Sequence, residues 1–348
     1  MATMTAARMY KKDDLRLETV PVPVPKDGEI LLKIEAAAVC GTDIRMLTNG
    51  AKGIDPEHPL ILGHEFAGVI AETGKNAVGY KIGQRVAYAP NTGCGLCDLC
   101  ISGNSHLCPD YLATGISLDG GFAEYCLIPE AGVRGGNLCP LPDNVSFEDG
   151  ALAEPLSCVC NGFEHADIHP GDRVLVVGAG PIGIMHCAMA LMAGGVVYLN
   201  DLSPERLREA KSIYPALHIL SGNLKEELTA ATNGHGADAI ITACPVPAVQ
   251  AQAIELAAVG GRVIFFGGVP ADKEPVGINT NLIHYKQLLV SGTTRASLAQ
   301  YRKVLSFIAE GVLDVHPLIT AHFSLSEIDK AIERAKKGTG LKNIILPK

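Results

Sequence analysis

The chain has 348 residues, 47% of them hydrophobic, with 38 glycines and a formal charge of −8. This length allows two domains, and this composition is typical of an α/β enzyme rather than a disordered chain. The negative charge and the lack of basic runs exclude a general nucleic-acid or anionic-membrane surface. No stretch has the length of a signal peptide or a membrane span, so we expect a cytoplasmic protein.

The first segment, residues 7–36, predicts two strands joined by a proline-rich connection at 20–25, which is too rich in proline for a central strand. Cys40 follows, and after it His64 and Glu65. Thiolate, imidazole and carboxylate form a plausible Zn²⁺ ligand set, in which three protein ligands leave one position open for catalysis. Taken singly, Cys40 could be a buried thiol and His64 a core histidine.

Four cysteines then fall within fifteen residues, in the pattern Cys94-x2-Cys97-x2-Cys100-x7-Cys108. This spacing predicts a closed Cys₄ zinc site of the structural kind. An iron–sulfur cluster is the alternative, because three close cysteines and a more distant fourth also bind such clusters. The remaining cysteines are expected to be buried thiols in a reducing compartment.

A dinucleotide fingerprint begins at residue 174. An apolar strand at 174–177 precedes Gly178-Ala-Gly180-Pro181-Ile182-Gly183, and a helix is predicted from about 181 to 192. The first glycine permits a tight turn, the second lets backbone approach a pyrophosphate at the helix N-terminus, and the third allows close helix–strand packing. Pro181 suits the first helical turn.

Asp201 ends the next predicted strand, 196–201. A carboxylate there can accept hydrogen bonds from both ribose hydroxyls of NAD and would repel the extra phosphate of NADP. A helix N-cap or a loop acid is the alternative for Asp201. Arg206, in the following helix, could tolerate a phosphate, so NADP stays open.

Alternation of strands and helices continues with strands at 237–243, 260–268 and 288–293, which predicts a doubly wound parallel sheet over about 155–290. Gly267 would let backbone approach the nicotinamide. From Ser297 the pattern changes to helices at 297–309 and 326–337 and a final strand at 343–346.

Together these motifs, with Gly120-Gly-Phe-Ala-Glu124-Tyr and Ala153-Glu154-Pro155, resemble the zinc-dependent medium-chain dehydrogenases, closest to the sorbitol and threonine dehydrogenase branch. The resemblance implies an α/β fold in two parts. A mainly β, GroES-like catalytic domain would comprise residues 1–154 and 295–348, with the structural zinc lobe at 93–109. A Rossmann domain would comprise residues 155–294.

The resemblance also implies residue roles. Cys40, His64 and Glu154 would bind catalytic zinc, and Glu65 would bind the metal directly or through water. Thr42 would relay the alcohol proton. Arg45 replaces a histidine that often passes this proton to solvent. Because arginine does not deprotonate, Arg45 is expected either to attract an anionic substrate group or to lie on the surface. Cofactor contacts are expected from Gly178, Gly180, Pro181, Ile182, Gly183, Asp201, Arg206, Gly267 and Thr293.

The expected activity is NAD-dependent oxidation of a secondary alcohol of a polyol, sugar alcohol or polyol phosphate to the ketone, reversibly, with two Zn²⁺ per chain. Amino-alcohol oxidation of the threonine dehydrogenase kind is the alternative. The alternative from another class is a non-enzymatic, NAD-sensing protein. The resemblance implies a homodimer or homotetramer.

Overall fold

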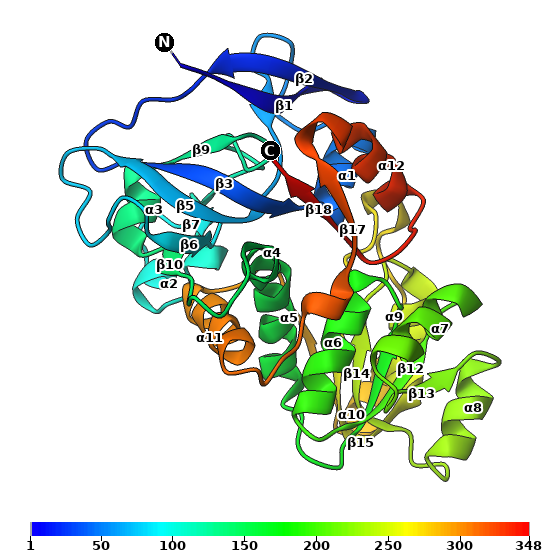
Figure 1. Cartoon of the computed structure of the whole chain (residues 1–348). Coiled ribbons are helices and arrows are strands. Elements are labelled where there is room, and N and C mark those ends of the chain that lie inside the picture. The colour runs from blue at the N-terminus through cyan, green and yellow to red at the C-terminus, as the bar shows by residue number, and fades with distance from the viewer. Residues whose placement is uncertain (1, 348) are drawn as a thin grey trace. The chain divides into compact units, whose positions relative to one another are not determined.

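The computed structural model describes residues 2–347 and divides the chain into two compact units (Figure 1). The first unit contains the chain up to Ser157 and from Arg295 onward, and the second is Cys158–Thr294. Among residues 2–347, no helix has both the length and the apolar character needed to cross a membrane.

The first unit is mainly β-structure. Its largest sheet has the order β10-β6-β5-β3-β18-β17, with β9 also paired to β3, and smaller sheets have the orders β2-β1-β4 and β7-β8. The strands are β1 (Thr3–Lys11), β2 (Asp14–Pro21), β3 (Ile30–Ala38), β4 (Leu60–Ile61), β5 (Glu65–Thr73), β6 (Arg85–Tyr88), β7 (Asn91–Thr92), β8 (Leu112–Ala113), β9 (Tyr125–Ile128), β10 (Leu138–Pro140), β17 (Ile319–Ser324) and β18 (Lys342–Leu346).

The N-terminal segment differs from its prediction. β1 and β2 form an antiparallel hairpin before the proline-rich connection, so this segment contains three strands rather than two. The hairpin turns at Lys12 and Asp13, and Asp13 has a φ of 55°. Aspartate tolerates this left-handed conformation. A Lys-Asp pair is nevertheless a weaker signal for a hairpin turn than Asn-Gly or Asp-Gly.

Short helices join and cover these strands. They are α1 (Gly41–Asn49), α2 (Asp98–Ile101), α3 (Glu130–Gly135), α4 (Phe147–Ala151), α11 (Leu298–Ala309) and α12 (Ile328–Lys336), with 3₁₀ turns η1 (Ser105–Leu107), η3 (His316–Leu318) and η4 (Leu325–Glu327). Residues of β1, β3, β5 and α12 bury their apolar side chains in one core, in which Phe66 and Tyr88 stack with ring centroids 5.4 Å apart.

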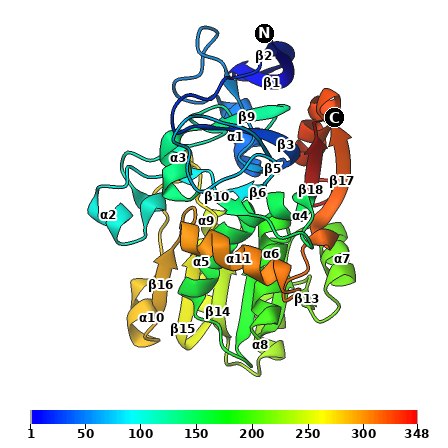
Figure 2. The same cartoon turned by 60° about the vertical axis from the view of Figure 1, so that its left-hand side comes forward.

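The second unit is a parallel six-stranded sheet in the order β13-β12-β11-β14-β15-β16 (Figure 2). Its strands are β11 (Arg173–Val177), β12 (Val196–Asn200), β13 (His218–Leu220), β14 (Ala237–Thr242), β15 (Ala257–Phe265) and β16 (Leu289–Gly292). The strand predicted at 260–268 begins three residues earlier and ends at Phe265.

The strands of the second unit alternate with helices, which confirms the predicted doubly wound fold. These helices are α6 (Pro181–Met192), α7 (Pro204–Ile213), α8 (Leu224–Ala231), α9 (Pro247–Leu256) and α10 (Thr280–Tyr285), with the 3₁₀ turn η2 (Ala271–Lys273). Helix α5 (Ala153–Ala166) connects the first unit to the second along the chain.

Candidate active site

Three neighbouring strands of the large sheet bring the predicted ligands together. β3 pairs with β5 so that Ala38 lies opposite Glu65, and with β18 so that Ala38 lies opposite Ile344. Both pairings are antiparallel. Cys40, just beyond β3, therefore lies near His64 on one side and near the start of β18 on the other.

Side-chain atoms of Cys40, His64 and Glu65 lie within 4.8 Å of one another. His64 is 4% exposed and Glu65 is fully buried. Glu65 Oε1 has no hydrogen-bond partner among the described residues. Burial and the nearby Glu65 charge raise the pKa of the Cys40 thiol. A buried group of sulfur, nitrogen and oxygen donors with an unpartnered oxygen fits a bound zinc ion.

Asp43 orients Cys40 and His64, which supply the sulfur and nitrogen donors of this group. It lies in the first turn of α1 and is fully buried. Its Oδ2 accepts a hydrogen bond of 2.9 Å from the backbone N–H of Cys40. Its Oδ1 lies 3.3 Å from His64 Nδ1, an ion-pair contact that leaves Nε2 for a metal. Metal-binding histidines usually present the other ring nitrogen to a carboxylate in this way.

The pKa of His64 results from opposing effects. Burial lowers the pKa of the imidazole, but the charges of Cys40 and Asp43 outweigh burial, so this pKa lies well above its ordinary value. The buried carboxylate of Asp43 would likewise stabilise a cation held in this place.

Lys342 is a buried cation at this site that the sequence analysis did not identify. It is the first residue of β18 and is 3% exposed. Its ammonium donates hydrogen bonds to Glu65 Oε2 and, over 3.0 Å, to the backbone carbonyl of Val39. Burial opposes the charged ammonium, but Glu65 and Cys40 raise the pKa of Lys342 overall.

Three further predicted residues belong to the first unit: Thr42 and Arg45 in α1, directly after Cys40, and Glu154 at the start of α5. Glu154 is in the first turn of α5 and is 7% exposed, but its carboxylate is not among the three grouped donors. Thr42, in the first turn of α1, is half-buried, whereas Arg45 is exposed. Arg45 Nη2 donates a hydrogen bond of 3.3 Å to Thr42 Oγ1.

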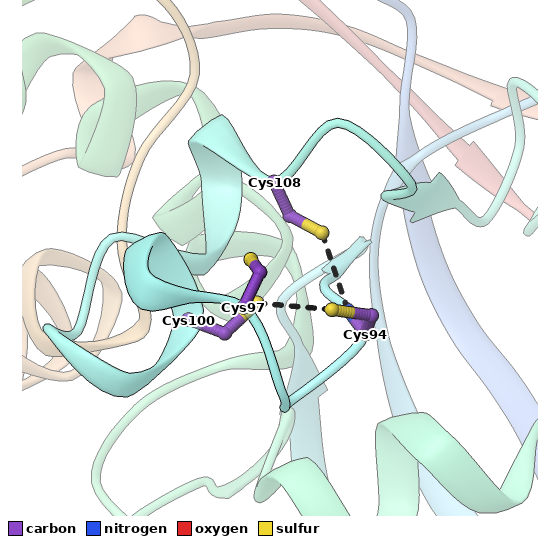
Figure 3. A group of neighbouring side chains, drawn as sticks. All are labelled: Cys94, Cys97, Cys100 and Cys108. Atoms are coloured by element: carbon purple, nitrogen blue, oxygen red, sulfur yellow. Dashed lines mark hydrogen bonds between the residues drawn. The ribbon is translucent and has the colours of Figure 1, made fainter.

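The four cysteines of the predicted lobe form a second group, with sulfur atoms within 4.8 Å of one another. Figure 3 shows Cys94 next to Cys100 and Cys108: the Cys94 and Cys100 sulfurs are 4.0 Å apart, and the Cys94 N–H donates to Cys108 Sγ over 3.4 Å. Hydrogen bonds from the backbone N–H groups of Leu96 and Cys97 lower the pKa of Cys94 to about 7. Four convergent thiols fit a closed, structural zinc site.

The glycine fingerprint has the predicted geometry. Gly178 has a φ of 113°, and a Cβ on Gly183 would lie 1.7 Å from the Gly178 carbonyl oxygen, so both positions require glycine. Gly180 is the N-cap of α6, and a Cβ there would meet nothing within 4 Å. Pro181 occupies the first turn, before Ile182. This open space beside a helix N-terminus fits a pyrophosphate.

Asp201 follows β12 and is bonded to backbone. Its two carboxylate oxygens accept hydrogen bonds of 2.7 Å, one from Ala179 N–H and one from Ser203 N–H. Asp201 therefore steadies the glycine loop, and each oxygen keeps a lone pair for a further donor. Arg206 lies in the first turn of α7, where its backbone N–H donates to Ser203 Oγ.

The two remaining predicted cofactor residues lie at the ends of β15 and β16. Gly267 packs against the backbone of Cys244, where a Cβ would lie 2.7 Å from the Cys244 carbonyl oxygen. The Thr293 backbone N–H donates to the carbonyl of Phe265 over 3.4 Å, and its buried hydroxyl has no partner among residues 2–347.

Comparison with known proteins identifies the family of this chain. The alcohol dehydrogenase GroES-like domain family matches residues 26–143, and the zinc-binding dehydrogenase family matches residues 181–310. Sorbitol dehydrogenase from Bacillus subtilis (strain 168) is 34% identical over 353 aligned residues, which cover 99% of this chain and 97% of that protein. The chain belongs to the zinc-dependent medium-chain dehydrogenases.

Solved structures of this family extend the comparison to the cofactor. A zinc-binding dehydrogenase from Sinorhizobium meliloti 1021 bound to NADP has a TM-score of 0.90, 28% identity and full coverage of both chains. An alcohol dehydrogenase from Escherichia coli CFT073 complexed with NADH has a TM-score of 0.89 and 26% identity, and covers 99% of this chain and all of the other. This dehydrogenase is thus an oxidoreductase that acts on CH–OH donors with zinc and a nicotinamide cofactor.

Two residues that complete the dehydrogenase site were not predicted from the sequence. Asp43 was visible in the Cys40-Gly-Thr-Asp motif, and its place three residues after Cys40, where a carboxylate can reach back to the N-cap backbone, was a usable signal. Lys342 gave no such signal, because only the sheet pairing brings β18 beside Cys40.

Proposed function

We propose that this dehydrogenase uses NAD⁺ to oxidise a secondary alcohol of a polyol or polyol phosphate to the ketone, and catalyses the reverse reduction. The observation that carries the proposal is the buried group of Cys40, His64 and Glu65 in a chain with an intact glycine fingerprint. The 34% identity to a sorbitol dehydrogenase supports a polyol substrate.

In this proposal each chain holds two zinc ions. Cys40, His64 and Glu154 hold the catalytic ion, with Glu65 close by, and Cys94, Cys97, Cys100 and Cys108 hold the structural ion. When bound, the catalytic zinc supplies the Lewis acidity that lowers the pKa of the alcohol, and the nicotinamide supplies the hydride acceptor. Asp43 fixes the orientation of His64 and the backbone of Cys40.

Thr42 is the proposed proton acceptor. Its hydroxyl oxygen takes the alcohol proton while its own proton moves on. Arg45 already donates to that oxygen, so the proton cannot leave through the guanidinium and must pass to water or to a cofactor ribose hydroxyl. Arg45 is exposed, and its guanidinium is a suitable contact for a phosphate or carboxylate on the substrate.

NAD rather than NADP is the proposed cofactor. Asp201 directly follows β12, and a carboxylate at this point of a dinucleotide-binding fold can accept hydrogen bonds from ribose hydroxyls, while its negative charge disfavours an added phosphate. The comparison of kcat/KM for the two cofactors tests this choice directly, and a preference for NADP would contradict it.

Two separate cysteine substitutions test the assignment of Cys40 as a ligand of the catalytic zinc. Cys40→Ser should abolish turnover while binding of NADH, followed by the fluorescence of the reduced cofactor, is kept. Cys139→Ser is the matched control, because Cys139 is buried but lies outside both metal groups. Turnover that survives Cys40→Ser would overturn the assignment.

We also propose a homodimer or homotetramer in the cytoplasm. β16 lies at the edge of the parallel sheet, and Leu289 on it is 69% exposed, which supports association with a second copy. All eleven cysteines are free thiols, which supports a reducing compartment. Light scattering and cell fractionation test these two points.

A further inference from the structure

Both polar backbone atoms of Gly267, two residues after the end of β15, are engaged inside the second unit. Its N–H donates a hydrogen bond of 2.8 Å to the carbonyl of Thr242, the last residue of β14. Its carbonyl accepts a hydrogen bond of 3.0 Å from Gln250 Nε2 on α9. The preceding residue, Phe266, packs edge to face against His186, with ring centroids 4.7 Å apart. The backbone that leaves β15 is therefore fixed in one orientation, and Gln250 is the side chain that holds its carbonyl.

Gln250 is a buried polar residue on the apolar face of α9. It is 8% exposed, and the next residues on the same helix face, Ala253 and Ile254, are buried as well. The helix packs against β14 and β15. An apolar side chain would fill this position without the cost of burying an amide, so the hydrogen bond to Gly267 is what distinguishes glutamine here.

Gly267 lies in the half of the sheet that the glycine fingerprint leaves free. The strand order β13-β12-β11-β14-β15-β16 has its switch point between β11 and β14. A dinucleotide lies across the carboxyl ends of the strands at such a point, with one mononucleotide half on each side. In the proposed function Asp201, after β12, contacts the adenosine half, and the end of β15 therefore belongs to the nicotinamide half. β15 is two strands from β11, about 10 Å away across the sheet.

We propose that Gln250 is a positioning residue that fixes the Gly267–Gly268 peptide for the nicotinamide half of the cofactor. The inference rests on the proposed cofactor site. A Cβ on Gly267 would lie 2.7 Å from the Cys244 carbonyl oxygen, whereas a Cβ on Gly268 would meet nothing within 4 Å. Gly267 is thus packed inward, and Gly268 borders open space in which the nicotinamide ring can lie.

The carbonyl that Gln250 holds also sets the direction of the next N–H group. Carbonyl and N–H point in opposite directions across a trans peptide, so the Gly268 N–H points away from Gln250. This N–H has no acceptor among residues 2–347, and it can donate to the carboxamide oxygen of the nicotinamide. Without the donor from Gln250 the peptide would be free to rotate, and the nicotinamide would lose a pre-organised partner.

Calorimetric titration with NADH and with ADP-ribose tests this role, because ADP-ribose lacks the nicotinamide and keeps the rest of the cofactor. Gln250→Met keeps the length of the side chain but has no donor. We expect it to raise the Kd for NADH by about three- to tenfold, the effect of losing one uncharged hydrogen bond, and to leave the Kd for ADP-ribose at its wild-type value. Gln252→Met, two residues further along α9 and on a different side of the helix, is the control and should change neither Kd.

The Kd for ADP-ribose separates a positioning role from a structural one. Equal weakening of both ligands in Gln250→Met would make Gln250 a structural residue of the second unit and would overturn the proposal, and so would a wild-type Kd for NADH. If the wild-type enzyme binds neither ligand, the proposed cofactor site fails, and this inference fails with it.

A second variant covers the case in which Gln250→Met does not fold. Gln250→Asn keeps the amide but shortens the side chain by one methylene, so its donor no longer reaches the Gly267 carbonyl. We expect the same selective loss of affinity for NADH. A wild-type Kd for NADH in Gln250→Asn would overturn the proposal.

Discussion

Asp43 Oδ1 lies 3.3 Å from His64 Nδ1, and both side chains are buried. Asp43→Ala should lower zinc affinity at the Cys40 site by about 10–100-fold, since carboxylates behind metal-binding histidines have effects of this size. Competition with a chelator measures the affinity. Asp55 and His58 form a similar pair on the surface, 3.2 Å apart, so Asp55→Ala is the control and should change nothing. Equal affinities for wild type and Asp43→Ala would contradict the assigned role.

The Cys₄ lobe should hold a structural ion that turnover does not use. Cys97→Ser should reduce the zinc content from two ions to one per chain and lower Tm by roughly 5–10 °C, since each kcal/mol moves the Tm of a unit of this size by about 2–4 °C. Metal analysis and a thermal melt measure both. Cys139→Ser should keep two ions. Loss of both ions in Cys97→Ser would contradict independent sites.

His186 should make the second unit sensitive to acid. Its ring is buried in α6 against Phe266, neither nitrogen has a partner among residues 2–347, and burial lowers its pKa to about 3. Because the unfolded chain binds a proton near pH 6.5 and the folded chain does not, stability is complete above pH 6.5 and falls as the pH drops toward 3, by up to about 4–5 kcal/mol.

Substitution of His186 tests this acid sensitivity. His186→Leu should flatten the dependence of unfolding free energy on pH between 6.5 and 3, measured by denaturant titration. His235→Leu, at an exposed position of the same unit, controls for the loss of an imidazole. An unchanged slope in His186→Leu would contradict the prediction.

Asp201 should determine the choice of cofactor. Asp201→Ala should raise the KM for NAD by about tenfold, as expected for the loss of charged hydrogen bonds, and should lower the KM for NADP. Steady-state kinetics with both cofactors give the ratio. Asp201→Ala also removes the hydrogen bond from the Ala179 N–H, which steadies the glycine loop. The loss of this bond should weaken the binding of NAD and NADP equally. Glu205→Gln, in the first turn of α7, is the control. An unchanged NAD/NADP ratio would contradict the role of Asp201.

The fold could be predicted in large part because its signals are local. The glycines of the fingerprint are separated by a few residues, and the strands and helices of the second unit alternate regularly. The β1–β2 hairpin could not be predicted, since the Lys12-Asp13 turn lacks the glycine that usually marks such turns.

The sequence alone could identify only those site residues whose side chains are typical metal ligands. Cysteine and histidine are recognisable as metal donors, and the structure groups Cys40 with His64 as expected. Lys342 is separated from Glu65 by most of the chain, and lysine at the start of a strand is usually exposed. The position of Lys342 beside Glu65 depends on the pairing of β18 with β3, which no local sequence pattern indicates.

NADH formation against a panel of polyols and their phosphates, with threonine and simple alcohols included, tests the central claim most directly. The measurement is made on the loaded enzyme, after zinc removal, and after zinc is restored. We predict that a polyol or polyol phosphate gives the highest kcat/KM, that zinc removal abolishes it, and that zinc restores it. If a polyol phosphate has a much higher kcat/KM than the unphosphorylated polyol, and Arg45→Met removes this difference, Arg45 is the residue that contacts the phosphate. Turnover that survives zinc removal, or no turnover on any polyol, would contradict the account.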